Sequence, residues 1–304
     1  MSDKKKEVTQ ESIPPMGLRM IAREFKKDKI AIFSLGLLVV LLLVIFIGAL
    51  FTDQDKVMYV SIFDKYAAPG AISADGTKFI LGADEGGRDV LGQLIIGARN
   101  SVTIGFAITV ITSIIGVGLG IISGYYGGIV DNILMRVVDF IMILPIMLII
   151  IVFVSIISNY NVWSFIFIMS AFYWVGKARL FRSKTLSEAR RDYVSASKTM
   201  GTGDFKIMFR EIMPNLSSLI ITNLTMNFAA NIGIETTLTF LGFGLPTNVP
   251  SLGTLIGYAS SGEVLVNRQW IWLPASILIL VLMLSINYVG QAFKRSADAR
   301  QRLG

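Results

Sequence analysis

Six apolar segments, separated by polar connections, restrict this chain to one class of fold. They are apolar for long enough to cross a hydrocarbon core of roughly 30 Å as helices. Charged residues make up only 16% of the chain, whereas a soluble domain carries about 25%. We therefore predict an all-α integral membrane protein with six transmembrane helices. They cover residues 30–51, 101–126, 133–158, 162–175, 216–240 and 271–293.

Three of these segments carry features that bear on their packing. The second is rich in glycine, which lets helix backbones approach closely, so we expect a helix packed on several sides. The third contains Pro145, which a membrane helix tolerates where neighbouring groups satisfy the freed carbonyl. The fourth is short, and it extends to Phe181 if Lys177 and Arg179 reach the membrane surface with their charged ends.

The positions of the cations orient the helices, because Lys and Arg are concentrated in the cytoplasmic connections of membrane proteins. If both termini lie in the cytoplasm, six of the 28 Lys and Arg residues fall outside and all the others lie in inner segments. The net charge of +7 is then a topology signal rather than a nucleic-acid surface. The six outer cations are Lys56, Lys65, Lys78, Arg88, Arg99 and Arg268.

The same layout divides the chain into segments. Residues 1–16 lack the apolar stretch of a cleavable signal peptide, and we expect a disordered cytoplasmic tail there. Residues 17–29 place apolar side chains on one helical face among cations, which predicts an interfacial helix along the inner leaflet. The alternative for that stretch is a disordered basic leader. The remaining segments are the first span (30–51), an extracytoplasmic segment (52–100), a core of five spans (101–293) with a cytoplasmic loop (182–214), and a cytoplasmic tail (294–304).

The residue types exclude most catalytic chemistry. The chain has no Cys and no His, so it has no disulfide, no thiolate nucleophile and no imidazole. It also lacks a G-x-x-x-x-G-K-[ST] phosphate loop and a G-x-S-x-G elbow. Asp139 follows Arg136 by three residues, which favours a local ion pair over a proton relay. We expect no catalytic residue, no metal and no cofactor in this chain, which is therefore not an enzyme by itself.

The longest cytoplasmic segment, 177–215, has a helical pattern that two glycines interrupt. Gly201 and Gly203 separate two helical stretches, and Pro214 is expected to stop the second one. Between them, Phe205, Met208, Phe209 and Ile212 recur at helical spacing and form an apolar face. Either the spans of this chain cover that face, or a cytoplasmic partner does.

The fifth span carries a polar stripe that a lipid-facing helix would not carry. Asn223, Asn227, Asn231 and Glu235 recur every four residues and so share one face. Polar side chains at this depth face a protein interior or a wet path. They act either as hydrogen-bonding links between helices or as the lining of a translocation pathway. The position of Glu235 near the outer end favours the structural role.

The segment 192–215 resembles the EAA loop of permease subunits in binding-protein-dependent ABC importers. That loop reads Glu-Ala-Ala, three residues, Gly, and later Leu-Pro, with the proline thirteen residues after the glycine. Ala196, Gly201 and Pro214 keep this pattern and its spacing, whereas Ser195 stands for the glutamate and Ser197 for the second alanine. Glu211 and Met213 replace the isoleucine and leucine of the family pattern.

Further blocks narrow the resemblance to oligopeptide and dipeptide permeases of the OppC/DppC type. They are LGADEGGRDVLGQLIIGARNSVTIG, GYYGGIVDNILMRVVDFIMILP, ETTLTFLGFGLP and the sixth span. The resemblance implies the type I ABC importer permease fold and import of peptides by alternating access, in the plasma membrane of a prokaryote. It also implies coupling to ATPases through Ser195, Ala196, Ser197, Gly201, Asp204, Phe205 and Pro214. Asn227, Asn231 and Glu235 are our candidates for the pathway.

The resemblance also implies partners. They are a second, OppB-like permease subunit, two OppD/OppF-like ATPases that bind ATP and Mg²⁺, and an OppA-like extracytoplasmic peptide-binding protein. The bilayer and the peptide complete the set, and no nucleic acid is expected. Nickel permeases share much of the pattern and are the alternative within the family. From other classes, a proton-coupled secondary transporter that uses Glu235 and a non-transporting scaffold or sensor remain as alternatives.

Overall fold

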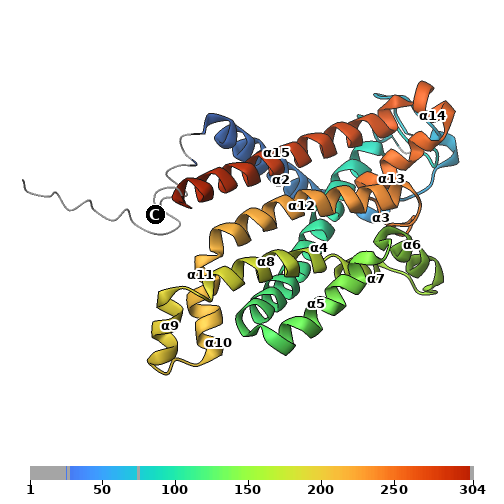
Figure 1. Cartoon of the computed structure of the whole chain (residues 1–304). Coiled ribbons are helices and arrows are strands. Elements are labelled where there is room, and N and C mark those ends of the chain that lie inside the picture. The colour runs from blue at the N-terminus through green and yellow to red at the C-terminus, as the bar shows by residue number, and fades with distance from the viewer. Residues whose placement is uncertain (1–24, 26–27, 74–75, 302–304) are drawn as a thin grey trace, which may run out of the picture.

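The structure, a computed structural model that describes residues 25, 28–73 and 76–301, is built around one 37-residue helix, α4 (Val90–Tyr126) (Figure 1). Helix α4 contacts α2, α5, α7, α8, α12 and α13, and α12 in turn packs against α15. Within the described residues the elements are helical, apart from two isolated β-bridges. The long helices besides α4 are α2 (Lys29–Phe51), α5 (Gly128–Ile143), α6 (Ile146–Ile156), α7 (Val162–Phe172), α8 (Val175–Glu188), α12 (Ser217–Phe240) and α15 (Gln269–Gln301).

Short helices occupy the connections. They are α3 (Gln54–Val57), η1 (Ile62–Asp64), α9 (Asp192–Thr199), α10 (Asp204–Lys206), η2 (Ile207–Ile212), α11 (Met213–Asn215), α13 (Leu252–Gly257), η3 (Tyr258–Ser260) and α14 (Gly262–Asn267). The segment between α3 and α4 folds onto η3, because the buried carboxylate of Asp84 accepts hydrogen bonds from Arg88, from Gln93 and from the phenol of Tyr258. This outer segment is thus attached to the helices and is more than a loose connection.

Helix α4 begins eleven residues before the expected start of the second span. Asp89 caps it by accepting hydrogen bonds from the amides of Leu91 and Gly92. The first turns contain polar residues, so they do not look like a membrane helix in the sequence. Those residues find partners here, and Asn100, for example, donates to the carbonyl oxygen of Pro250 at 2.8 Å. The helical part of the 52–100 segment is therefore longer than expected.

Three glycines on α4 bring the backbone of α8 into direct contact, as the glycine-rich composition predicted. A Cβ atom on Gly116 would lie 2.7 Å from the carbonyl oxygen of Trp174, and one on Gly120 would lie 2.7 Å from that of Ala178. A Cβ atom on Gly124 would lie 2.6 Å from the carbonyl oxygen of Arg182. Because real Cβ atoms do not approach so closely, only glycine permits this packing.

Helices long and apolar enough to span a membrane are present in the described residues. Helices α2 and α4 and residues Gln269–Arg295 of α15 meet this description singly, and α5 with α6 meets it as a pair bent by 79°. The all-helical membrane fold is thus confirmed. Helix α12 and the α7–α8 pair do not meet the same hydropathy criterion, so the count of six spans stays a prediction.

The expected third span is not one helix. Helix α5 ends at Ile143 and α6 begins at Ile146, with Pro145 between them. Proline has no amide hydrogen, and its ring collides with the carbonyl of the preceding turn. The helix is interrupted here, and α5 and α6 meet at an angle of 79°. The expectation that Pro145 lies inside an unbroken helix is wrong.

The expected fourth span is likewise divided, into α7 and α8, at Tyr173 and Trp174. Lys177 does not extend to a membrane surface, because its side chain is buried and its ammonium donates to Thr112 Oγ1 on α4. Arg179 forms an ion pair with Asp139 on α5. Lys177 therefore binds inside the bundle and does not snorkel, whereas for the exposed Arg179 the extension to a membrane surface stays a prediction.

Residues just before α2 contact the last turns of α15. Asp28 caps α2 and forms an ion pair with Arg295 near the end of α15, and Phe25 packs against Phe293. The predicted tail 1–16 and most of the predicted interfacial helix 17–29 lie outside the described residues. At the other end, α15 continues as helix through the predicted tail as far as Gln301.

Candidate functional site

A helical hairpin, residues 192–215, lies at the end of the bundle where α4 terminates (Figure 1). We call it the 192–215 hairpin. It consists of α9, a turn at Gly201, and a second arm made of α10, η2 and α11. Gly201 has a backbone φ of +80°, a left-handed conformation that residues with a Cβ atom rarely adopt. The predicted interruption of two helices by Gly201 and Gly203 is confirmed.

Pro214 does not stop the second arm, contrary to our expectation. The backbone stays helical from Asp204 through Pro214 into α12. Residues Ile207–Ile212 widen into a π-helix, and the amide of Met213 donates to the carbonyl oxygen of Met208. A π-turn is a known way to accommodate a break in the α-helical ladder. The helix does not end at Pro214; the chain changes direction at α11 and continues as α12 (Figure 1).

One side of the hairpin packs against the bundle. Val194 of α9 and Ile207, Met208 and Ile212 of the second arm are buried. They form a single cluster with residues of α4 and α8, namely Val117, Ile121, Tyr125 and Phe181. The spans of this chain therefore cover the apolar face. Met208, Phe209 and Ile212 lie on this face as predicted. Phe205 does not, because its side chain is 73% exposed and Ile207 is buried instead.

Polar contacts fix the hairpin internally and to α4. Ser197 Oγ on α9 donates to Glu211 Oε2 on the second arm at 2.7 Å. The phenol of Tyr125, one residue before the end of α4, donates to Asp204 Oδ1 at 2.6 Å. The ammonium of Lys198 lies 4.5 Å from the centre of the Tyr125 ring, a cation–π distance. Tyr125 thus contacts both arms of the hairpin, in addition to the apolar packing on α4.

The predicted coupling residues separate into two groups. Ser195, Ala196, Phe205 and Pro214 are exposed, and Phe205 stacks beside Phe209 with ring centres 4.7 Å apart. Ser197 and Asp204 instead make the internal contacts just described, and Gly201 forms the turn. Sequence reasoning missed Met200, which is 76% exposed beside the turn, and Tyr125. Met200 and Phe205 are thus exposed apolar side chains on an otherwise polar hairpin.

The polar stripe on α12 divides in the same way. Asn231 is buried, and its Nδ2 donates to Thr109 Oγ1 on α4 at 2.8 Å. Glu235 is fully buried, and its Oε1 accepts from Thr239 Oγ1 at 3.0 Å. Thr236 Oγ1 lies 3.4 Å from the other carboxylate oxygen, Oε2. These contacts correspond to the hydrogen-bonding interpretation for Asn231 and Glu235.

Asn223 and Asn227 remain half-buried. The Nδ2 of Asn227 donates to the carbonyl oxygen of Asn223 at 2.8 Å, so this contact stays within α12. On the same helix Met226 and Ala230 are exposed. This part of α12 is therefore the part of the stripe that is still open to a partner or a pathway.

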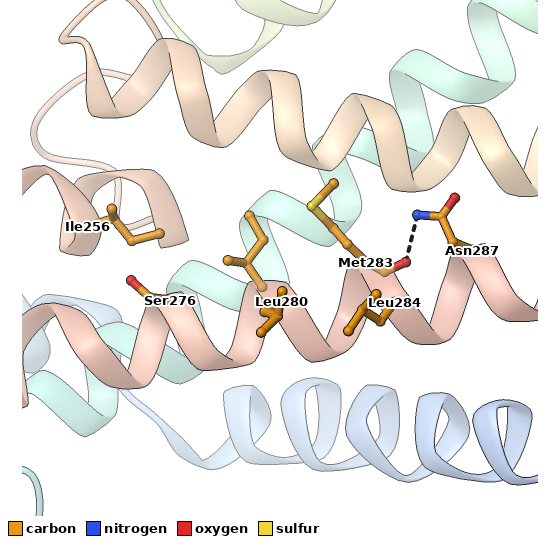
Figure 2. A pocket seen from close by; sticks show the side chains of 7 residues that line it. Ile256, Ser276, Leu280, Met283, Leu284 and Asn287 are labelled. Atoms are coloured by element: carbon orange, nitrogen blue, oxygen red, sulfur yellow. Dashed lines mark hydrogen bonds between the residues drawn. The ribbon is translucent and has the colours of Figure 1, made fainter.

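A shallow groove of about 370 Å³ follows the neighbouring surface of α15 (Figure 2). Asn287 and Ser276 are the polar residues among those that line it. The amide of Asn287 donates to the carbonyl oxygen of Met283 at 2.9 Å, within α15 (Figure 2). The lining is Ile256, Ser276, Ile279, Leu280, Met283, Leu284 and Asn287.

Helix α8, which leads into the hairpin, is held to α5 by two ion pairs. Arg182 contacts both carboxylate oxygens of Asp131, which also accepts from Ser123 Oγ. Arg179 contacts Asp139. The expected local pair of Asp139 with Arg136 is wrong, because Asp139 binds α8 instead. Helix α8 brings Arg179 within reach of Asp139, a contact that the spacing within α5 does not reveal.

The sequence matches two protein-family descriptions. Residues 116–302 match the inner membrane component of binding-protein-dependent transport systems. Residues 18–69 match the N-terminal transmembrane domain of oligopeptide transport permease C. The first match includes α8, the hairpin, α12 and α15.

Individual relatives agree with these matches. The oligopeptide transport system permease protein OppC of Lactococcus lactis subsp. cremoris is 52% identical over 281 residues, which are 92% of this chain and 94% of that protein. The oligopeptide permease AmiD of Streptococcus pneumoniae is 36% identical over 93% of this chain and 89% of its own length. The dipeptide permease DppC of Haemophilus influenzae is 36% identical over 76% of this chain and 78% of its own length.

Proposed function

The chain belongs to the family of inner membrane components of binding-protein-dependent transport systems, and we propose that it is the OppC-type permease subunit of an ABC importer of peptides. The identity of 52% to an oligopeptide permease over nearly the whole chain is the observation that carries this proposal. The peptide, rather than the nickel ion, is the substrate that the names of the relatives favour. The relatives likewise do not favour the proton-coupled secondary transporter.

The 192–215 hairpin is the element through which ATP hydrolysis would drive transport. A partner ATPase can move membrane helices only through a stiff contact. The hairpin is fixed by the bond from Ser197 to Glu211 and by its apolar packing against α4 and α8. Met200 and Phe205 present the exposed apolar side chains that would enter a groove on the ATPase. Ser195 and Ala196 lie on the exposed side of α9 and complete that surface.

The remaining partners follow from the same family. A second permease subunit would face this chain, two ATPases would bind ATP and Mg²⁺ below the membrane, and a peptide-binding protein would deliver the substrate from the other side. Both termini would lie in the cytoplasm. Alternating access would then result from rocking of the two permease subunits against each other.

The pathway would pass the half-buried part of the α12 stripe. Asn223 and Asn227 are available there, next to the exposed side chains of Met226 and Ala230. Asn231 and Glu235 support this surface from behind through their bonds to Thr109 and Thr239. A face of this kind offers hydrogen-bonding groups to a peptide backbone without selecting particular side chains.

Reconstitution tests the proposal. The chain is co-expressed with a second OppB-type permease and two ABC ATPases, and proteoliposomes of the complex receive a peptide-binding protein and a labelled oligopeptide. We expect uptake that requires ATP and the binding protein and that persists when the proton gradient is collapsed. Uptake by the single chain, loss of uptake with the proton gradient, or transport of nickel in place of peptide would overturn it.

A further inference from the structure

Lys177 is the most deeply buried cation on α8. Its residue is 3% exposed, and its ammonium donates to Thr112 Oγ1 on α4. The hydroxyl of Thr112 donates its own hydrogen to the carbonyl oxygen of Ile108 at 2.6 Å, so it serves Lys177 as an acceptor. In the part of the chain that the structure describes, Lys177 has no carboxylate partner within salt-bridge distance.

The two arginines on the same helix have carboxylate partners. Arg182 forms an ion pair with Asp131, and Arg179 forms one with Asp139. Both guanidinium groups are partly exposed, and both have their counter-ion on α5. Lys184 on the same helix is exposed to solvent, whereas Lys177 is buried and has no carboxylate partner among the described residues. Burying an ammonium without a counter-ion is costly, and an unbranched apolar side chain of similar length would avoid that cost. Stability therefore does not explain a lysine at this position.

The contact of Lys177 lies beside a second inter-helix contact. Thr109 on α4 accepts from Nδ2 of Asn231 on α12 at 2.8 Å. Thr112 lies three residues further along α4, and the carbonyl oxygen of Thr109 is a second, longer acceptor for its hydroxyl at 3.3 Å. Two polar contacts on neighbouring residues of α4 thus connect this helix with α8 and with α12 inside the bundle.

The position of Lys177 in α8 gives this connection a direction. The helix runs without a break from Lys177 to Glu188, and the 192–215 hairpin begins four residues later. Force applied to the hairpin therefore moves α8 as a rod, and the polar contact nearest its opposite end is the one from Lys177 to Thr112. On the far side of α4, Asn231 belongs to the stripe that continues to Asn227.

We propose that Lys177, through Thr112, is a positioning residue that passes movement of the hairpin to α4 and to the polar stripe of α12. This inference rests on the proposed function. An ammonium suits this role because its bond to a neutral hydroxyl breaks and forms again more readily than a buried ion pair. A tight apolar contact at the same place would keep α8 attached without such a switchable bond.

The test uses the reconstituted complex with three measurements: thermal stability, ATPase activity without substrate, and peptide taken up per ATP hydrolysed. For Lys177→Met we expect unchanged or higher thermal stability, preserved basal ATPase activity, and about a tenfold fall in peptide per ATP, a size typical of coupling between distant sites. Thr112→Val should lower the same ratio, whereas Thr112→Ser keeps the hydroxyl and should preserve it. Arg179→Met, which removes an exposed cation from the same helix, is the matched control and should leave the ratio unchanged.

Each outcome decides a different question. An unchanged ratio in Lys177→Met and Thr112→Val overturns the inference. A fall in thermal stability of Lys177→Met that accounts for the loss of uptake, with a ratio per ATP like the wild type, shows that the lysine is only structural and also overturns it. If the wild-type complex itself takes up no peptide with ATP, the proposed function fails before Lys177 is tested.

Discussion

The phenol of Tyr125 and the carboxylate of Asp204 are joined by a hydrogen bond of 2.6 Å that connects the end of α4 with the start of the second arm of the hairpin. Lys198 of the first arm lies against the same tyrosine ring. Both arms therefore use one side chain of α4 as their reference point. Any displacement of the hairpin relative to α4 must stretch or break these contacts.

Removing the phenol hydroxyl should loosen the hairpin without unfolding the subunit. For Tyr125→Phe we expect a loss of about 1 kcal/mol, the usual net value of one hydrogen bond, together with a larger fractional loss of ATP-driven peptide uptake. Asp204 is exposed, so its carboxylate is hydrated when the bond is lost. Uptake assays on the reconstituted complex measure this, with Tyr126→Phe on the adjacent exposed tyrosine as control. Equal activity of the two variants would show that the bond does not matter for coupling.

Gly201 should be sensitive to backbone conformation and insensitive to side-chain volume. Its φ is +80°, but no atom lies within 4 Å of a Cβ atom built there. Gly201→Val should therefore strain the turn by about 1–2 kcal/mol and abolish coupled uptake while the complex stays in the membrane. Gly201→Asn should retain most activity, because asparagine tolerates this region. If valine and asparagine behave alike, the conformation of the turn is not what transport requires.

As a control for this position, Gly203→Ala changes a glycine two residues away. Gly203 has φ of −66°, which any residue adopts, and it also has free space around it. We expect wild-type uptake and wild-type ATPase stimulation in this variant. A defect as large as that of Gly201→Val would contradict the conformational explanation.

Replacing a glycine of α4 by alanine should disturb the packing of α8 at some positions and not at others. Gly120→Ala places a methyl group 2.7 Å from the carbonyl oxygen of Ala178, and overpacking of this kind costs about 1–3 kcal/mol. Gly118→Ala, two residues away, meets no atom within 4 Å and should be neutral. The thermal unfolding midpoints of complexes carrying Gly120→Ala or Gly118→Ala are compared, with loss of assembled subunits as the measured signal. Similar midpoints would show that α8 does not lie on these glycines.

The two ion pairs between α5 and α8 should differ in strength, because they differ in burial. Asp131 is 8% exposed and contacts both Arg182 and Ser123. Asp131→Asn leaves the arginine without its counter-ion and should cost about 2 kcal/mol, less than a fully buried pair. Asp139→Asn breaks the exposed pair with Arg179 and should cost about 0.5 kcal/mol. The reverse order in thermal unfolding would contradict the assigned partners.

The features that depend on neighbours in the chain were predicted well. Apolar periodicity placed the boundaries of α2 and α12 within one residue, because burial patterns and helix formation are properties of the local chain. Gly201 and Gly203 marked a turn for the same reason. Pro145 and Pro214 show the limit: one divides α5 from α6, while the other lies in a helix that a π-turn adapts. The surroundings of each proline decided the outcome.

The features that depend on distant parts of the chain were missed or divided between alternatives. The spacing of Arg136 and Asp139 suggested a local pair, yet α8 supplies a closer guanidinium. The charged side chain of Lys177 suggested a position in contact with water, yet its ammonium binds the hydroxyl of Thr112 on α4 inside the bundle. Tyr125 carried no signal at all, because its role comes from Asp204, 79 residues away.

By itself, the sequence determined the helical membrane class, the glycine turn of the hairpin and the family resemblance, since each rests on residue types at short, fixed spacings. Only the tertiary structure decided which carboxylate meets which cation, which face of the hairpin is buried, and which members of the α12 stripe remain open. Those outcomes depend on which helix lies beside which. Side-chain hydrogen bonds and ion pairs act over a few ångströms, so they are fixed only when α4, α8 and α12 have packed together.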